Sequence, residues 1–234
     1  MSLITAYDLR KRFITGDVEV YALAGVDIAI ESGEFITITG RSGAGKSTLL
    51  YQLSLLDEPS SGSVAVHGQD TAIMTHQART AIRLRTFGYV FQEYALIPEL
   101  TAFENVLLPA LMLGKTTCEA YARSLLERVG LSDRMDHRPA ELSGGQQQRV
   151  AIARALINSP EVVFADEPTA NLDSETAEQV MALLQELNRD GQTLVLVTHD
   201  TRVHTEGARM IEMHDGCIVV DTGGALSPGI ASGA

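Results

Sequence analysis

The pattern of apolar and polar positions first predicts strands. Apolar and polar residues alternate in "VDIAI" (26–30), and "EFITITG" (34–40) is a β-branched run that ends in glycine. Both patterns are typical of strands, and we expect residues 3–38 to be mostly extended. The runs "EVVFADEP" (161–168) and "TLVLVTH" (193–199) are apolar at almost every position before their polar ends. Such continuous runs predict strands that are buried on both faces of a sheet.

Other segments carry the helical period. "RSGAGKSTLLYQLSLL" (41–56) leads from a glycine-rich turn into an apolar helix, and "SETAEQVMALLQELNRDG" (174–191) is amphipathic. A helix over 101–113 should be bent or broken by Pro109. The segment 116–130 predicts another helix. Its sequence also predicts a capping box, formed by Thr116 and Glu119.

Strands and helices alternate along the chain, with short strands also predicted at 61–68 and 88–92. This alternation predicts an α/β domain built on a parallel sheet. The helical pattern from about 93 to 140 then reads as a subdomain inserted into one domain of residues 1–222. Residues 223–234 are mostly glycine, alanine, serine and proline, and we expect a flexible tail.

Composition narrows the possible functions. The 234 residues suffice for a substantial core, and the formal net charge is −12. A broad nucleic-acid surface needs the opposite charge, so no nucleic-acid partner is predicted. The two cysteines have no metal-binding or disulfide spacing. No apolar run is long enough to span a bilayer, and the N-terminus has no apolar core of a signal peptide.

The segment "GRSGAGKS" (40–47) matches the phosphate-loop pattern G-x-x-x-x-G-K-[ST]. It follows a predicted strand and opens a predicted helix, as the mechanism requires. Its backbone N–H groups would surround phosphate oxygens. Lys46 would reach the β and γ phosphates, and Ser47 would offer its hydroxyl to Mg²⁺. The alternative is an ordinary glycine turn with a solvated lysine.

The buried run at 161–168 contributes two acids. A strand that ends in Asp166 directs this carboxylate from the carboxyl edge of the sheet, beside the phosphate loop. Asp166 suits Mg²⁺, and Glu167 is placed to polarise an attacking water. An acid pair in a turn is the alternative, but the phosphate loop makes it the weaker one. Together the two motifs predict nucleotide hydrolysis.

A third motif, "LSGGQQQRVAIARAL" (142–156), has no nucleophile, base or metal ligand. Ser143 and Gln146 fit a capping box, so a helix start is the simplest interpretation. However, Gly144 and Gly145 each cost about 1 kcal/mol of helix stability relative to alanine. Glycines leave the N–H groups of a helix start uncovered, and these groups favour an anion. The motif therefore predicts a phosphate site.

The order of these motifs resembles that of ABC-transporter ATPase subunits. The phosphate loop is followed by "VFQ", the 142–156 motif, "VVFADEPTANLD" and "LVTHD", and the resemblance covers about residues 3–220. It implies a P-loop NTPase domain of α/β class, with a mostly parallel core sheet, an N-terminal antiparallel β subdomain and a helical subdomain. It also implies an ATPase that uses ATP and Mg²⁺.

The resemblance assigns roles to individual residues. Glu167 would be the general base, His199 would contact the γ-phosphate, and Gln92 would sense that phosphate and Mg²⁺. Two such domains would pair head to tail, and Asp173 would couple the two sites. The signature motif, Ser143, Gly144, Gly145 and Gln146, would contact ATP held by the partner. The implied Mg²⁺ ligands are Ser47, Gln92 and Asp166. The implied ATP contacts are Phe13, Gly40, Arg41, Ser42, Gly43, Ala44, Gly45, Lys46, Ser47 and Thr48, with Tyr21 a less suitable alternative to Phe13 for stacking on adenine.

Longer stretches are similar to the lipoprotein-releasing (LolD), macrolide-exporting (MacB) and cell-division (FtsE) group, and to haem-efflux and peptide-resistance ATPases. This implies a separate transmembrane permease, a second ATPase subunit, and a location at the cytoplasmic face of the membrane. Export or extraction is the favoured activity, and FtsE-like signalling to an extracytoplasmic enzyme is the alternative. A soluble ABC protein of translation or DNA repair is disfavoured, because the chain lacks a second domain and a coiled coil. Tyr94 departs from the group pattern in a region expected to face the permease.

Overall fold

The computed structural model describes residues 2–16, 18–199 and 209–223, and contains two sheets. The larger sheet has six strands in the order β10-β9-β3-β8-β7-β6. All neighbours in it are parallel except β10, which runs antiparallel to β9. In that order the strands are Cys217–Asp221, Arg209–His214, Phe35–Gly40, Thr193–Val197, Val162–Asp166 and Phe87–Val90.

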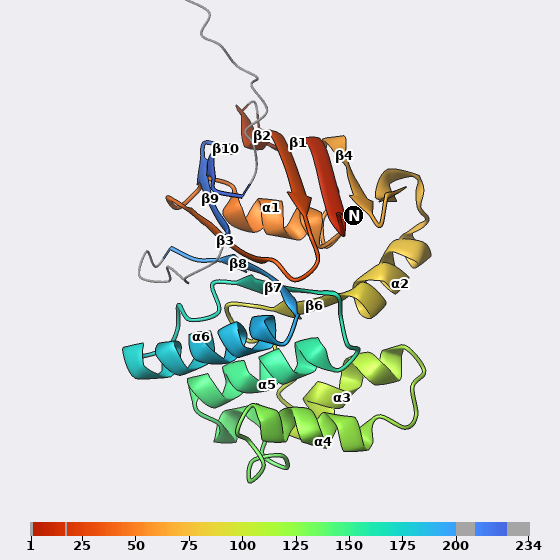
Figure 1. Ribbon diagram of the computed structural model, residues 1–234, viewed down its shortest axis with the longest axis vertical. Helices are drawn as coiled ribbons and strands as arrows, with labels where there is room; N and C mark the ends of the chain where they lie inside the picture. The colour runs from red at the N-terminus through yellow and green to blue at the C-terminus, as the bar shows by residue number, and fades with distance from the viewer. Residues whose placement is uncertain (1, 17, 200–208, 224–234) are drawn as a thin grey trace, which may run out of the picture.

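The smaller sheet is antiparallel and has the order β2-β1-β4-β5. Its long hairpin is formed by β1 (Ile4–Thr15) and β2 (Val18–Ile30), and β4 (Ser61–Val66) and β5 (Gln69–Asp70) complete it. The helix α1 (Lys46–Leu53) packs between the two sheets (Figure 1). The phosphate loop therefore starts from the larger sheet and ends beneath the smaller one.

The opposite face of the larger sheet carries a layer of helices, α3 to α6 (Figure 1). None of the helices in the described ranges has the length and apolar character needed to cross a bilayer. The remaining helices are α2 (His76–Thr86), α3 (Ala102–Met112), α4 (Glu119–Arg128), α5 (Gly144–Leu156) and α6 (Ser174–Arg189), with short 3-10 turns at Thr71–Ile73 and Pro139–Glu141.

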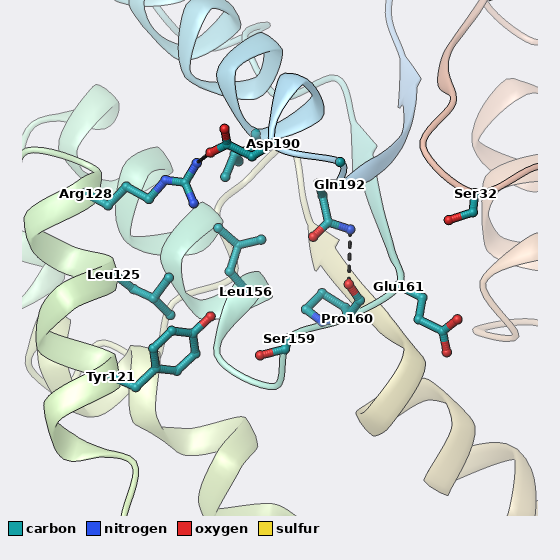
Figure 2. Close-up of a pocket in the computed structure, with 12 residues that line it drawn as sticks. Ser32, Tyr121, Leu125, Arg128, Leu156, Ser159, Pro160, Glu161, Asp190 and Gln192 are labelled. Carbon is teal, nitrogen blue, oxygen red and sulfur yellow. Dashed lines mark hydrogen bonds and ion pairs between the residues drawn. The ribbon is translucent and has the colours of Figure 1, made fainter.

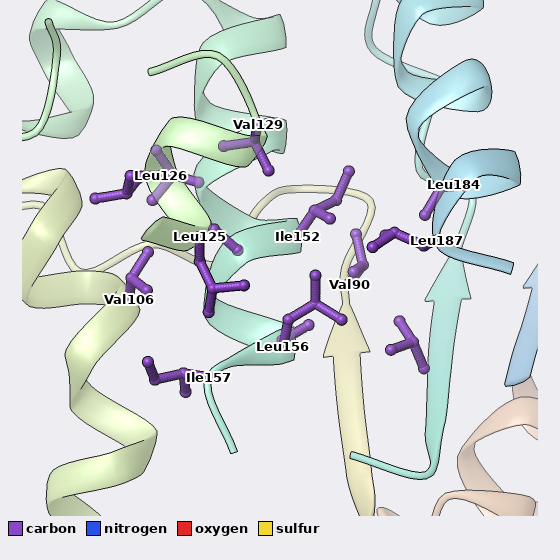
Figure 3. Close-up of a cluster of buried hydrophobic side chains, with 14 of the residues drawn as sticks. Val90, Val106, Leu125, Leu126, Val129, Ile152, Leu156, Ile157, Leu184 and Leu187 are labelled. Carbon is purple, nitrogen blue, oxygen red and sulfur yellow. The ribbon is translucent and has the colours of Figure 1, made fainter. Parts of the chain in front are cut away.

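Side chains of the central strands alternate between two cores. In β7, Val162 and Phe164 join the core beneath α1, whereas Val163 and Ala165 join the core under the helical layer. Figure 3 shows the second core, in which Leu125 and Ile152 are among the side chains that fill the space between helices and sheet. This alternation explains why β7 and β8 are apolar at almost every position.

The predicted α/β class and mostly parallel core sheet are confirmed. The capping box predicted at Thr116 and Glu119 is wrong, because α4 begins at Glu119 with Cys118 at the N-cap and no side-chain cap. Pro109 lies inside α3. The helix α2 was not predicted. Most of the predicted tail, residues 224–234, lies outside the described residues, and the division into subdomains stays a prediction.

Candidate nucleotide-binding site

The phosphate loop connects the end of β3 to the start of α1, as predicted. Two of its glycines allow the backbone to approach neighbouring strands closely. A methyl group on Gly40 would lie 2.4 Å from the carbonyl oxygen of Met213, and one on Gly45 would lie 2.2 Å from that of Ala22. Both glycines also have positive φ, 142° and 98°. No other residue fits these positions without moving a strand.

The side chain of Lys46 lies inside the phosphate loop. This side chain is largely buried, and Nζ donates hydrogen bonds to the carbonyl oxygens of Gly40 (3.0 Å) and Arg41 (3.1 Å). Residues 41–43 are exposed around it. A buried ammonium group and the N-terminus of α1 place positive charge at one point, which is the physical requirement for binding phosphate.

Asp166 and Ser47 meet across the sheet edge. Ser47 Oγ donates a hydrogen bond of 2.9 Å to Asp166 Oδ1, and Asp166 is buried at the end of β7. Burial and the negative charge of Asp166 raise the pKa of Tyr51, one turn further along α1, to about 12. A hydroxyl and a carboxylate are the hard oxygen ligands that Mg²⁺ prefers, so this pair fits the ion implied by the sequence.

Glu167 and His199 form a second pair at the same edge. The Nδ1 atom of His199 lies 2.6 Å from Glu167 Oε2, and the backbone N–H of Glu167 donates to the carbonyl oxygen of Val197. Glu167 has a φ of 48°, in the left-handed region. The two residues follow β7 and β8, which are neighbours in the sheet. The topology thus joins residues that are 32 positions apart.

Gln92 and Phe13 contact residues other than Ser47, Asp166, Glu167 and His199. Gln92 follows β6 and is exposed, and its carbonyl oxygen accepts a hydrogen bond of 3.1 Å from Asn171 Nδ2. Phe13 lies on β1, half-exposed, with Lys11 Nζ 5.5 Å from its ring centre. The smaller sheet approaches the phosphate loop through Ala22, which follows Tyr21. Both aromatic candidates for adenine stacking remain predictions.

The signature motif begins α5 with the predicted capping box. The N–H group of Gln146 donates to Ser143 Oγ (3.3 Å), and the N–H group of Ser143 donates to Gln146 Oε1 (2.9 Å). Within the described residues no hydrogen bond joins this motif to the phosphate loop. The two motifs also begin helices on opposite faces of the larger sheet, because α5 packs in the core under the helical layer and α1 packs in the other core.

Neighbouring side chains explain why glycine is required at Gly144 and Gly145, which the sequence alone did not indicate. A methyl group on Gly145 would lie 2.2 Å from Thr176 Cγ2. One on Gly144 would lie 2.9 Å from the Tyr94 hydroxyl and 3.5 Å from Leu172 Cδ2. Side chains of the same chain thus fill the space beside each glycine. Tyr94 directs its hydroxyl to the signature motif, and the expected contact of its region with a permease stays a prediction.

Asp173 has a local role as the N-cap of α6. Its carboxylate accepts the backbone N–H of Thr176 (3.0 Å) through Oδ1 and the Thr176 hydroxyl (2.7 Å) through Oδ2. The hydrogen bond from the Thr176 backbone is the main reason why the pKa of Asp173 is lowered. The spacing of Asp173 and Thr176 is typical of a cap and would have allowed this prediction.

A cavity of about 300 Å³ lies away from these residues, near the starts of β7 and β8. Figure 2 shows Gln192 reaching the carbonyl oxygen of Pro160, and Arg128 paired with Asp190. Tyr121 contributes to the same wall. None of the predicted site residues lines it. Among the described residues no group of three or more histidine, cysteine or acidic side chains is placed to hold a metal ion.

A phosphate loop between β3 and α1, with two acids at the end of β7, defines a P-loop nucleotide-binding domain. The family model for ABC transporters matches residues 23–170. The chain belongs to this family and is an ABC-transporter ATP-binding domain, a class of ATPases.

Relatives and solved structures agree with this placement. The chain is 49% identical over 226 residues to the macrolide export ATP-binding/permease protein MacB of Bradyrhizobium diazoefficiens, covering 95% of this chain and 35% of that protein. It is 46% identical over 222 residues to the probable syringafactin export protein SyfD of Pseudomonas syringae, covering 94% and 34%. The chain spans about a third of the length of these relatives.

Among solved structures, the ATP-binding cassette MJ0796 bound to ADP and Pi, a dimer in a post-hydrolysis state, superposes with a TM-score of 0.85. The two sequences are 41% identical, and the match covers 93% of this chain and 97% of that one. The fold predicted from the resemblance is thereby confirmed.

Proposed function

We propose that the chain is the ATP-hydrolysing part of an exporter of the MacB and LolD type, and that it drives a transmembrane permease. The observation that carries this proposal is that two hydrogen-bonded pairs, Ser47 with Asp166 and Glu167 with His199, lie at the same edge of the larger sheet. Identity to export proteins over nearly the whole chain supports the direction of transport.

In this proposal the phosphate loop binds ATP. The N–H groups of the loop surround the phosphate oxygens, and Lys46 moves from the loop carbonyls to the β and γ phosphates. Ser47 and Asp166 would hold Mg²⁺, with Gln92 as a further ligand. When bound, Mg²⁺ neutralises charge on the β and γ phosphates. The aromatic ring of Phe13 stacks on adenine.

Glu167 acts as the general base in this scheme. Its carboxylate accepts a proton from the water that attacks the γ-phosphorus, while the bond from that phosphorus to the β–γ bridging oxygen breaks and ADP leaves. His199, which now bonds to Glu167 Oε2, orients this carboxylate and contacts the γ-phosphate. Both side chains can serve the same water because β7 and β8 are adjacent.

A second copy of the chain completes each site. The start of α5 in one copy, with Ser143 and the two glycines, contacts the γ-phosphate held by the other. Asp173 lies near the same surface and links the two sites. The dimeric cassettes with the same fold support this pairing.

The permease contact is assigned to a largely apolar groove of about 330 Å³ beside Gln92. It lies between α2, β6 and α3, and Leu56, Phe91, Pro109 and Met112 are among its lining residues. Leu56 and Met112 are exposed apolar side chains. We assign an apolar segment of the permease to this groove, because relatives join ATP-binding and permease parts in one protein. This contact would hold the domain at the cytoplasmic face of the membrane.

Replacing Glu167 with glutamine tests the ATPase assignment. The amide cannot take a proton, so ATP turnover should fall by about a hundredfold or more while ATP binding persists. Turnover, binding of a fluorescent ATP analogue, and dimer formation by light scattering should be measured together. The control is Glu178→Gln on the exposed surface of α6. Turnover at the wild-type rate in Glu167→Gln would refute the role of Glu167.

Capture of the tagged chain from detergent-solubilised membranes tests the export assignment. Mass spectrometry should identify a four-helix permease with a large extracytoplasmic domain. Capture of a many-helix importer, or of no membrane protein, would refute the export assignment and leave the ATPase assignment intact.

A further inference from the structure

The loop that follows Gln92 has an unusual backbone. Tyr94 and Ala95 both have positive φ, 59° and 49°, in the left-handed region that residues with side chains rarely adopt. Arg154 on α5 holds them there, with Nη2 donating to the Tyr94 carbonyl (2.7 Å) and Nη1 to the Ala95 carbonyl (2.5 Å). Two parallel bonds from one planar group fix the loop relative to the signature helix.

The side chain of Tyr94 makes a second connection to the same helix. A methyl group on Gly144 would lie only 2.9 Å from the Tyr94 hydroxyl and 3.5 Å from Leu172 Cδ2. Tyr94 is partly buried, so the ring is confined between its loop and α5. Arg154 thus fixes the backbone of Tyr94 near the end of α5, and the Tyr94 hydroxyl touches the start of α5.

Gln92 is two residues before Tyr94, and it is also tied to the segment before α6. Asn171 Nδ2 donates to the Gln92 carbonyl, and Leu172 is the next residue in the chain. A shift of the Gln92 loop toward bound nucleotide would therefore move Tyr94 and Leu172 together. These two side chains border the position that a methyl group on Gly144 would occupy.

We propose that Tyr94 is a positioning residue that sets the start of the signature helix according to the position of the Gln92 loop. Through it, nucleotide bound in one chain prepares that chain's signature motif to receive the partner's ATP. This inference rests on the proposed function, because it needs ATP shared between two copies. Tyr94 acts through Gly144 and need not touch nucleotide itself.

The test uses Glu167→Gln as the background, in which ATP should hold the dimer. Tyr94→Ala removes the ring, and Tyr94→Phe removes only the hydroxyl. Tyr121→Phe is the matched control, because Tyr121 is an exposed tyrosine on α4 in the cavity of Figure 2. Two quantities are measured: the ATP concentration for half-maximal dimerisation by light scattering, and the affinity of the dilute monomer for a fluorescent ATP analogue.

Tyr94→Ala should raise the ATP concentration for half-maximal dimerisation about tenfold or more, with a smaller rise for Tyr94→Phe and none for Tyr121→Phe. Monomer affinity should stay within about twofold, because the phosphate loop is untouched. Unchanged dimerisation in both Tyr94 variants, or an equal loss of monomer affinity, would overturn the inference. If the Glu167→Gln parent forms no ATP-dependent dimer, the proposed function fails first, so the two failures are distinguishable.

Discussion

Replacing Gly145 with alanine has two opposite effects on stability: a gain in helix propensity and a steric clash with Thr176. Gly145 lies in the first turn of α5 and has no positive φ, so helix propensity alone predicts that alanine stabilises the protein by about 0.5–1 kcal/mol. However, the new methyl group would lie 2.2 Å from Thr176 Cγ2, far inside van der Waals contact. One of the two atoms must move.

Neither atom can move freely. Thr176 is β-branched and therefore stiff at χ1, and its hydroxyl bonds to Asp173 at the cap of α6. Rotating the methyl group away would break that bond, and shifting α5 would disturb a helix with eight buried residues. Overpacking of this kind costs about 1–3 kcal/mol. The clash is severe, so we take the upper part of that range, about 2–3 kcal/mol, and after the gain in helix propensity we expect a net loss of about 1–2.5 kcal/mol.

Urea unfolding of four proteins checks this estimate: wild type, Gly145→Ala, Thr176→Ser and the double variant. Serine keeps the hydroxyl and removes the methyl group, so the double variant should recover about 1 kcal/mol or more relative to Gly145→Ala. If Gly145→Ala is more stable than wild type, or if Thr176→Ser does not rescue it, the steric explanation of this glycine is wrong.

The contacts of Asp173, Arg209 and Arg154 can each be tested by one substitution. Asp173→Asn removes a carboxylate whose pKa is lowered by hydrogen bonds from Thr176. A carboxylate with a lowered pKa stabilises the folded state at pH values above the ordinary aspartate pKa. This stabilisation is lost as the pH falls through the lowered pKa. The urea midpoint of wild type should therefore decline more steeply than that of the variant below about pH 4, and equal slopes would contradict this. Arg209 forms a bidentate pair with Asp221 and also contacts Glu34, and all three side chains are partly buried. Arg209→Met should therefore lower the free energy of unfolding by about 2–3 kcal/mol, and a loss below about 0.5 kcal/mol would count against it. Arg154→Lys replaces two planar guanidinium nitrogens, each bonded to a different carbonyl, with one ammonium nitrogen, so light scattering in the Glu167→Gln background should show weaker ATP-driven dimerisation with unchanged monomer affinity.

The features that could be predicted from the sequence are those whose causes are local. The phosphate loop is a contiguous motif, and the run around Val163 is apolar on both faces of the strand, so site and strand follow from neighbouring residues. The helix α2 could not be recognised in the same way. It has no fully buried residue, and its stability comes from the Thr75 cap and from contacts such as that of Arg83 with the Leu55 carbonyl.

The parts of the site that the sequence could not show have a common physical reason. The sequence suggested an anion to explain the signature glycines, but it could not show that Thr176 and Tyr94 occupy the space beside them. That space is defined by segments 31 and 50 residues away in the chain, which the folded topology brings together. Likewise, the sequence could not show that the Tyr94 hydroxyl reaches the start of α5, and the expected contact of its region with a permease stays a prediction.

The steric and the anion explanations of the signature glycines concern different sides of the same backbone. Within the described residues, the N–H group of Gln146 is bonded to Ser143 Oγ, and that of Gln147 to the Ser143 carbonyl. The N–H groups of Gly144 and Gly145 have no acceptor there, while the positions of their missing side chains are filled by Tyr94 and Thr176. A larger residue would therefore displace the helix start from its neighbours and turn these two donors away from their present direction. Close packing on one side fixes the donors on the other, which is the preorganisation that a phosphate shared between two chains would require.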